Sequence, residues 1–374
     1  MPRTITAAVL REIGQPLHVE RLKLADPGDE EILVEIEAAG VCHSDLHYLR
    51  GELAAPLPLV PGHEGSGRVV SVGPRTSGAI RPGDRVALLW RPNCGRCAQC
   101  LAGAPIMCEL GGVQAKVGGL PNRAIKMSDG AGAVHHLMGV SCFSDHVVVH
   151  ERSVVTVPED IPAEVAAIAG CAVITGVGAV RNVIGTCVGE PVVVMGIGGV
   201  GLAAIMGAKL AGAHPLIAVD IDNSKLALAR RLGATHTVNS READPVAEVF
   251  GVADSGAAWV IEAIGHPQTL SAAMRMLRPR GTVIAVGLGA GGQTFEVPIN
   301  ELVQRQKRVV GSLYGSSIPA LDLPAIFDLY RSGRLPLDEL VGERFALEDI
   351  SDAFGALASG AVGRSIIVPE GAPS

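Results

Sequence analysis

The stretch VVVMGIGGVG, residues 192–201, decides the fold of one half of this 374-residue chain. Four apolar residues run into a G-x-G-x-x-G turn formed by Gly196, Gly198 and Gly201, and a helical pattern follows over residues 202–210. In dinucleotide-binding folds this arrangement forms a strand, a tight turn and a helix whose first backbone amides face a pyrophosphate. A glycine triplet also occurs in purely structural turns, so the surrounding sequence has to support the interpretation.

The residues after the turn support a nucleotide site and favour NAD. The next apolar run ends in Asp220, about 20 residues beyond the turn, where an acidic side chain binds the adenosine ribose 2′-hydroxyl. A carboxylate at this place repels the 2′-phosphate of NADP. Lys225, early in the following helical pattern, is a candidate for a further ribose contact, although it fits an exposed helix lysine equally well.

Two different patterns divide the chain. Residues 1–90 contain short β-type runs separated by proline and glycine, which predicts an antiparallel β-rich unit. From residue 191 onward, strand and helix patterns alternate, which predicts a doubly wound parallel sheet. Because the last residues resemble the first unit, we expect one domain of residues 1–172 and 315–374, interrupted by a nucleotide-binding domain of residues 173–314. The expected elements of the parallel sheet and its helices lie at residues 192–195, 200–210, 216–220, 224–232, 258–263, 269–277 and 282–286.

Composition excludes several classes of partner. With 48% hydrophobic and 18% charged residues the chain can bury a large core, and its net charge is −7. Without a basic block, neither nucleic acid nor a membrane surface is an expected partner, which leaves small molecules. The most apolar stretch, residues 191–210, contains several glycines and fits a buried strand, turn and helix better than a membrane span. The first residues lack the apolar core of a signal peptide, so we expect a cytoplasmic protein.

Four of the eight cysteines lie close together in the sequence. Cys94, Cys97, Cys100 and Cys108 form the pattern C-x2-C-x2-C-x7-C. Four thiolates complete the tetrahedral shell of Zn²⁺ and leave no open position, as in structural zinc sites. An iron–sulfur cluster is a competing interpretation, but the fourth cysteine lies too far along the chain and Glu109 replaces the usual proline. Unbound thiols are the plain alternative.

A second set of candidate metal ligands is dispersed. A catalytic Zn²⁺ takes three protein ligands and keeps a fourth position open, and the candidates here are Cys42, His63 and Cys171. Taken singly, each of them is more often a buried thiol or a core histidine. Their sequence surroundings single them out, namely GVCHSDLH at residues 40–47, PGHEGSG at residues 61–67 and AGC at residues 169–171.

These stretches, with the four-cysteine segment and the glycine turn, resemble the zinc-dependent alcohol dehydrogenases of the medium-chain dehydrogenase/reductase superfamily over nearly the whole chain. The resemblance implies a GroES-like β-rich catalytic domain and a Rossmann cofactor domain, with the active site in a cleft between them. It implies that Cys42, His63 and Cys171 bind catalytic zinc, so that each chain holds one catalytic and one structural Zn²⁺. The implied activity is the NAD-linked interconversion of primary or secondary alcohols with aldehydes or ketones.

The resemblance also implies roles for residues around the catalytic metal. Bound Zn²⁺ lowers the pKa of an alcohol hydroxyl, and the proton passes through Ser44 and the cofactor ribose to His47. Asp45 is implied to orient His63, although a helix cap explains it equally well from the sequence alone. Glu64 lies close behind the metal in this family.

Further residues are expected to contact the cofactor. Thr175 matches the position that packs against the nicotinamide ring, and His43 stands where many relatives have an arginine against the pyrophosphate. Another cationic position of the family holds Ile367 here, and Arg364 is a candidate substitute for it. The full expected cofactor set is His43, Thr175, Gly196, Gly198, Gly199, Val200, Gly201, Asp220, Lys225, Ile264 and Leu288.

Two other functions stay open. One is a thiol-dependent formaldehyde dehydrogenase, because GSLYG at residues 311–315 is similar to that branch, although the side chains that grip glutathione are not recognisable. The other is a non-enzymatic zinc- or nucleotide-binding relative, against which the retained metal ligands and the Ser44 and His47 pair argue. By resemblance, edge strands around residues 297–313 pair across a two-fold axis, so a homodimer is expected and a homotetramer is the second choice. The few aromatic residues favour an aliphatic substrate pocket.

Overall fold

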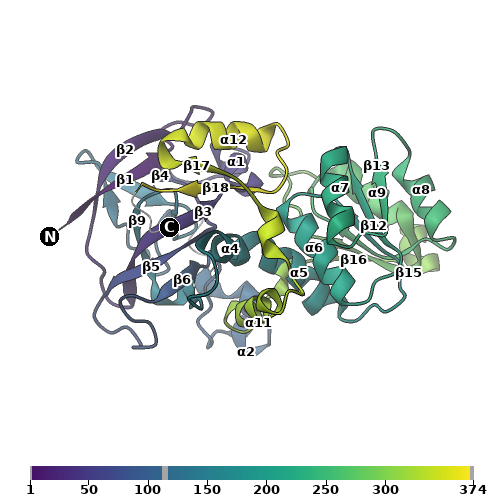
Figure 1. Ribbon diagram of the computed structural model, residues 1–374, viewed down its shortest axis with the longest axis horizontal. Coiled ribbons are helices and arrows are strands. Elements are labelled where there is room, and N and C mark those ends of the chain that lie inside the picture. Colours follow the sequence, from purple (N-terminus) through teal and green to yellow (C-terminus); the bar gives the residue numbers. More distant parts are fainter. Residues whose placement is uncertain (1, 112–116, 371–374) are drawn as a thin grey trace. The chain divides into compact units, whose positions relative to one another are not determined.

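The computed structural model describes residues 2–111 and 117–370, and the chain forms two compact units (Figure 1). Unit 1 comprises Met1–Cys171, Ile318–Asp328 and Leu337–Ser374. Unit 2 comprises Ala172–Ser317 and Leu329–Pro336. A long middle segment therefore interrupts a unit that is built from both ends of the chain.

Unit 2 is built on a six-stranded parallel sheet in the order β13-β12-β11-β14-β15-β16. Numbered within the sheet, this order is 3-2-1-4-5-6, the doubly wound arrangement in which nucleotides bind where the strand order reverses. All four residues of β11 are buried, as expected for a strand with both faces covered. The predicted Rossmann fold is confirmed. Its strands are β11 (Val192–Met195), β12 (Leu216–Asp220), β13 (His236–Asn239), β14 (Ala257–Glu262), β15 (Leu277–Ala285) and β16 (Arg308–Gly311).

Helices connect these strands, and carboxylates cap two of them. Asp222 accepts hydrogen bonds from the backbone of Ser224 and Lys225, and Asp244 accepts one from Val246, which satisfies amides that have no partner within the helix. The sequence patterns did not predict β13 or α8, because both are short and only partly buried. The helices are α6 (Gly199–Leu210), α7 (Asn223–Leu232), α8 (Pro245–Val252), α9 (Pro267–Met276) and α10 (Ile299–Arg305).

The expected edge strand at residues 297–313 is wrong over most of its length. Only β16 is extended there, and it is indeed the outermost strand of the sheet. The residues before it form α10, which begins after Pro298. Ile299, Leu302 and Val303 follow a helical spacing, and their exposed fractions are 76%, 37% and 69%. These apolar residues therefore lie on one face of α10 and do not form a strand.

Unit 1 contains two sheets and the short helices that join them. One sheet has the order β1-β2-β7-β8-β4, and the other has the order β10-β6-β5-β3-β18-β17 with β9 also paired to β3. Near the end of the chain, β18 pairs with the end of β3 through Ile366↔Gly40 and Ile367↔Ala39, so the C-terminal segment completes the sheet that leads to Cys42. The strands are β1 (Arg3–Val9), β2 (His18–Leu24), β3 (Glu31–Gly40), β4 (Leu59–Val60), β5 (Gly65–Val72), β6 (Arg85–Leu88), β7 (Met127–Ser128), β8 (Ala133–His136), β9 (His146–His150), β10 (Val154–Thr156), β17 (Val341–Ala346) and β18 (Arg364–Val368). The remaining α-helices in the described part of the chain are α1 (His43–Leu49), α2 (Ala98–Leu101), α4 (Ala163–Ile168), α11 (Pro319–Arg331) and α12 (Ile350–Ala358), together with α5 (Ile174–Gly178), which belongs to unit 2.

One continuous helical segment, Ala163–Ile184, is long and apolar enough to cross a membrane. It joins α4 and α5 through a π-helical turn, Ala169–Val173. Of its most apolar window, 89% is buried inside the protein, as in the core helices of globular domains. The apolar stretch at residues 191–210 is instead divided into β11, the glycine turn and α6, as predicted.

A buried histidine predicts how stability depends on pH. Burial lowers the pKa of His136 on β8 from 6.5 to about 3, and the positive charges of His135 and Lys126 add to this effect. The imidazole takes up a proton more readily in the unfolded chain than in the folded protein. The contribution of neutral His136 to the free energy of unfolding is therefore complete above about pH 6.5 and falls by roughly 1.4 kcal/mol per pH unit toward pH 3. We expect His136→Leu to flatten the acid side of the stability curve in urea unfolding between pH 6.5 and 4. An unchanged slope would contradict the prediction.

Candidate active site

The three dispersed metal-ligand candidates meet in unit 1. Cys42, His63 and Cys171 are buried, and their ligand atoms all lie within 4.8 Å of one another. Cys42 precedes α1, His63 lies between β4 and β5, and Cys171 lies in the π-helical turn after α4. Two thiol sulfurs and one imidazole nitrogen fit the three-ligand set of a catalytic zinc.

Asp45 holds two of these ligands in place. Its Oδ1 lies 3.0 Å from Nδ1 of His63 and accepts a hydrogen bond from Gly62 N at 3.2 Å. Its Oδ2 accepts a hydrogen bond from Cys42 N at 3.3 Å. The carboxylate is thus both the histidine partner and the helix cap that the sequence left as alternatives. With Nδ1 engaged, His63 has Nε2 available for a metal.

The electrostatics of the three groups fit a cation. Burial disfavours the charged imidazolium of His63, but Asp45 and Cys42 together outweigh burial and raise its pKa well above the ordinary value. A hydrogen bond from the Cys171 thiol lowers the pKa of Cys42 well below its ordinary value despite burial, with help from Arg364. The neighbouring Cys42 sulfur and burial raise the pKa of Cys171. Two thiols that share one proton in this way are suited to a divalent cation, which accepts both as thiolates.

A buried ion pair lies behind the ligands. Arg364 Nε lies 3.1 Å from Glu64 Oε2, and Arg364 Nη1 donates to the Val41 carbonyl at 3.3 Å. The exposed fractions of Arg364 and Glu64 are 5% and 0%. A Cβ at Gly40 would lie 2.7 Å from the Glu64 carboxyl carbon, so glycine leaves the space that Glu64 occupies. Arg364 therefore pairs with Glu64 within unit 1, which is not the pyrophosphate contact considered for it from the sequence.

An aromatic side chain lies beside the metal ligands and was missed by the sequence reasoning. The Trp90 indole meets the His63 imidazole edge to face, with ring centroids 6.2 Å apart and an interplanar angle of 89°. Trp90 follows β6 by two residues, and no spacing in the sequence distinguishes it from a core tryptophan. The expectation of an aliphatic substrate pocket stays a prediction, because the Trp90 contact concerns a metal ligand.

The backbone under Cys171 is tightly packed. A Cβ at Gly170 would lie 2.6 Å from the Leu88 carbonyl oxygen on β6. We expect Gly170→Ala to displace the π-helical turn and to weaken zinc binding by roughly tenfold to a hundredfold, an effect typical of groups that support metal ligands. Zinc titration with a competing chelator measures the change. Gly355→Ala on α12, where an added Cβ meets nothing within 4 Å, is the control and should bind zinc normally.

Helix α1 carries both predicted proton-transfer residues, Ser44 near its start and His47 in its last turn. Ser44 Oγ lies 3.7 Å from Cys42 Sγ, and His47 follows Ser44 by three residues on the same helix face. Nδ1 of His47 contacts Oε2 of Glu52, which lies just beyond the helix. Glu52 was not among the predicted site residues, because nothing in its sequence spacing marks it. His43, the first residue of α1, is exposed.

The four remaining candidate ligands form a second cluster in unit 1. The sulfurs of Cys94, Cys97, Cys100 and Cys108 all lie within 4.8 Å of one another. Backbone N–H groups of Cys100 and Glu109 lower the pKa of Cys97 to about 6, which favours a thiolate. Four sulfurs at this separation fit a tetrahedral zinc shell without an open position.

In unit 2, the predicted cofactor residues lie at the carboxyl end of the parallel sheet. Asp220 ends β12, and its Oδ2 accepts a hydrogen bond from Ile197 N in the glycine turn at 2.6 Å. Ile264 and Leu288 follow β14 and β15, and both are more than 40% exposed. Gly198, which precedes α6, has nothing within 4 Å of an added Cβ, so the backbone there is open to a ligand. The other predicted residues of unit 2 are Thr175 on α5, Gly199, Val200 and Gly201 at the start of α6, and Lys225 on α7.

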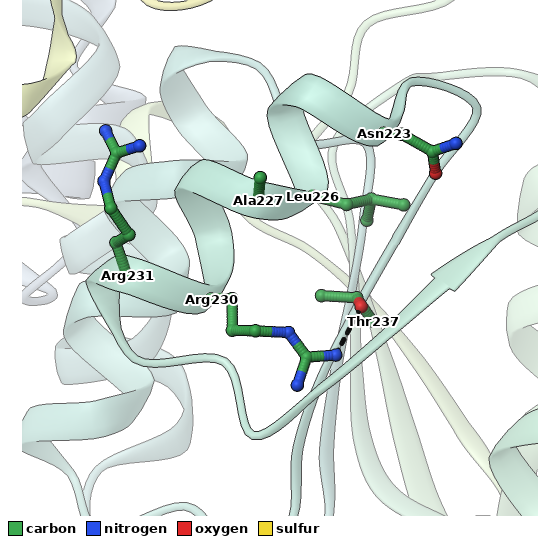
Figure 2. A pocket seen from close by; sticks show the side chains of 6 residues that line it. All are labelled: Asn223, Leu226, Ala227, Arg230, Arg231 and Thr237. Atoms are coloured by element: carbon green, nitrogen blue, oxygen red, sulfur yellow. Dashed lines mark hydrogen bonds between the residues drawn. The ribbon is translucent and has the colours of Figure 1, made fainter.

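Figure 2 shows a shallow hollow elsewhere in unit 2, between α7 and β13. Arg230 crosses it and donates to Thr237 Oγ1 at 2.7 Å. None of the predicted cofactor residues lines this hollow. Its lining residues are Asn223, Leu226, Ala227, Arg230, Arg231 and Thr237.

Comparisons with known proteins agree with the fold and the ligand geometry. Residues 28–159 match the family described as alcohol dehydrogenase GroES-like domain, and residues 199–331 match zinc-binding dehydrogenase. The NDMA-dependent alcohol dehydrogenase of Amycolatopsis methanolica is 35% identical over 97% of this chain and 98% of that protein. The geraniol dehydrogenase of Castellaniella defragrans is 34% identical over 97% of each. The chain belongs to the zinc-dependent alcohol dehydrogenases of the medium-chain dehydrogenase/reductase superfamily.

Its activity is accordingly that of an alcohol dehydrogenase, an oxidoreductase with small-molecule substrates. The crystal structure of benzyl alcohol dehydrogenase from Acinetobacter calcoaceticus is similar with a TM-score of 0.92 and 33% identity, and the match covers 98% of this chain and 99% of that one. Acetophenone reductase from Geotrichum candidum, solved in complex with NAD, has a TM-score of 0.80 and 26% identity over 98% of each chain. The S-(hydroxymethyl)glutathione dehydrogenase of Paracoccus denitrificans is 33% identical over 97% of this chain and 99% of that protein.

Proposed function

We propose that the enzyme is NAD-dependent and binds two Zn²⁺ per chain. The catalytic ion is held by Cys42, His63 and Cys171, and the structural ion by the four-cysteine cluster. The observation that carries the proposal is the convergence of three buried ligands, one of which is oriented by Asp45. When bound there, Zn²⁺ acts as a Lewis acid that makes an alcohol hydroxyl acidic near neutral pH.

The chain's own residues then move the proton and hold the cofactor. Ser44 would accept the hydroxyl proton, and His47, on the same face of α1, would receive it and release it to water. A nicotinamide cofactor, when bound, would supply the acceptor for the hydride of the alcohol carbon. Asp220 binds the adenosine ribose hydroxyls, because its carboxylate ends β12 beside the glycine turn. The carboxylate of Asp220 supports a preference for NAD, because it would repel the 2′-phosphate of NADP.

For the substrate we propose an apolar primary alcohol with an aromatic or allylic group. Relatives named for geraniol and benzyl alcohol support this class. The Trp90 indole beside His63 supplies an aromatic face of matching chemistry. The thiol-dependent formaldehyde dehydrogenase remains the second candidate, because a relative of that kind is 33% identical.

The test is metal analysis joined to turnover of a substrate panel. Two zinc per chain and NADH formation from benzyl alcohol or geraniol support the proposal. Turnover of formaldehyde only in the presence of glutathione would support the second candidate instead. Parallel assays with NADP test the role of Asp220, since equal rates with both nucleotides would contradict the proposed preference.

His43 predicts a difference in cofactor affinity. His43 begins α1 and is exposed, and an imidazole offers pyrophosphate neither the permanent charge nor the forked donors of a guanidinium. We expect His43→Arg to lower the dissociation constant of NADH at neutral pH by about fivefold, the effect of roughly 1 kcal/mol. Fluorescence titration of NADH measures it, and an unchanged or higher constant would reject the prediction.

We also propose a cytoplasmic homodimer, with a homotetramer as the second choice. The outermost strand β16 offers unpaired backbone groups at the edge of its sheet. Next to it in the chain, α10 exposes the aliphatic residues Ile299, Leu302 and Val303. An isologous interface across a two-fold axis would cover both elements. Sedimentation equilibrium distinguishes the dimer from the monomer and the tetramer.

A further inference from the structure

A short loop after α1 returns a carboxylate to the imidazole of His47. Oε2 of Glu52 contacts Nδ1 of His47, five residues earlier in the chain. The backbone N–H groups of Glu52 and Leu53 both donate to the His47 carbonyl, at 2.8 and 3.1 Å. Gly51 makes the turn with φ 73°, and a Cβ there would lie 2.8 Å from Cγ2 of Ile13. The backbone thus places Glu52 against the ring, which distinguishes the pair from two long surface chains that meet by chance.

The contact determines which ring nitrogen carries the proton. An ionised carboxylate is an acceptor only, so Nδ1 of a neutral His47 must donate to Glu52. Nε2 then carries the lone pair, and it has no hydrogen-bond partner among residues 2–111 and 117–370. The side chains of His47 and Glu52 are 23% and 35% exposed, so the pair is partly shielded and still reaches water.

The other carboxylate of α1 does not compete for this histidine. Asp45 uses Oδ1 for His63 and Gly62, and Oδ2 for the backbone of Cys42. Two carboxylate–histidine pairs therefore involve residues of α1. Asp45 pairs with His63 at the metal ligands, and Glu52 pairs with His47 at the end of the proposed proton path. The two pairs do not share a residue.

We propose that Glu52 is a positioning residue for proton transfer, which holds His47 in the orientation and tautomer in which Nε2 accepts the proton. This inference rests on the proposed dehydrogenase function. The hydroxyl proton of the alcohol would pass by way of Ser44 to Nε2 of His47, while a bound nicotinamide cofactor would take up the hydride. The imidazolium that forms is stabilised by the adjacent Glu52 carboxylate and then releases one proton to water.

Three substitutions, two of them also combined, test the kinetic part of the proposal. Glu52→Gln keeps the size of the side chain and removes its charge, and we expect kcat to fall about tenfold, with the KM values for alcohol and NAD unchanged. Glu12→Gln is the matched control, because Glu12 is exposed and adjoins Ile13, which packs beside the same turn; it should behave as wild type. In a His47→Asn background, Glu52→Gln should have no further effect. If Glu52→Gln lowered kcat by the same factor in the His47→Asn background, the role of Glu52 would be merely structural and the inference would be overturned.

A spectroscopic readout separates this inference from the proposed function. In ¹⁵N-histidine-labelled wild-type protein, with the His47 signal assigned from His47→Asn, we expect neutral His47 to be protonated on Nδ1. Glu52→Gln should shift it toward the tautomer mixture of free imidazole. A neutral ring protonated on Nε2 in the wild type would overturn the inference whether or not the enzyme turns over. Failure of the wild type to oxidise any alcohol with NAD would reject the proposed function, while the tautomer would still decide the role of Glu52.

Discussion

Replacing Cys171 with alanine is expected to remove one of two zinc ions and to lower kcat/KM on the order of a thousandfold or more. Only Cys42 and His63 would remain, and two ligands do not hold a catalytic zinc that normally has three. The large effect follows because the Lewis acid at the reacting oxygen is lost, whereas the fold of unit 1 rests on sheets that do not include Cys171. Metal analysis of the purified variant, with steady-state kinetics on the best alcohol, measures both changes.

A second buried cysteine in unit 1 provides the control. Cys142 is 0% exposed and Cys171 6%, so both are buried, and Cys142 belongs to neither metal-ligand group. Cys142→Ala should retain both zinc ions and most of the activity, at a stability cost of about 1 kcal/mol. Retention of two zinc ions by Cys171→Ala, or loss of an ion from Cys142→Ala, would contradict the assignment of the catalytic ligands.

Two glycines of the nucleotide turn are expected to respond differently to the same substitution. A Cβ at Gly201 would lie 1.9 Å from the carbonyl oxygen of Gly196, so the turn itself must move. We expect Gly201→Ala to destabilise the protein by about 3 kcal/mol, in the range of overpacked sites. Gly198 has φ −84° and no atom within 4 Å of an added Cβ. Gly198→Ala should therefore fold with a stability within about 0.5 kcal/mol of wild type.

The affinity for NAD is expected to distinguish the two variants further. In a G-x-G-x-x-G turn the second glycine allows the backbone to approach the pyrophosphate, so a methyl group at Gly198 would meet the bound nucleotide. We expect Gly198→Ala to weaken NAD binding on the order of tenfold or more without loss of fold. Urea unfolding and NADH titration of both variants provide the measurements. Normal NAD affinity in a folded Gly198→Ala would show that the pyrophosphate lies elsewhere.

Site residues could be predicted from the sequence where local spacing or the resemblance to the dehydrogenase family marked them. The glycine turn joins β11 and α6 within ten residues, and the parallel sheet followed from alternating strand and helix patterns. Short elements with weak apolar patterns, such as β13, were missed, and α10 was taken for a strand. In both cases a few residues carried too little periodicity to decide the type of element.

Contacts between distant residues could not be predicted from the sequence. Trp90 against His63 and Arg364 against Glu64 join different elements of unit 1, and no spacing relates the two partners. Arg364 was a candidate for a cofactor contact, because the sequence does not show in which direction its side chain points. Even Glu52, only five residues from His47, depends on the backbone turn at Gly51.

By itself, the sequence determined the class of each unit, the four-cysteine cluster and the glycine turn, because each depends on residues that are close together in the chain. Only the tertiary structure decided how Cys42, His63 and Cys171 meet, and which charged groups lie behind them. The reason is physical: β3, the loop before β5 and the π-helical turn after α4 are brought together by packing of the whole unit, which no local pattern encodes.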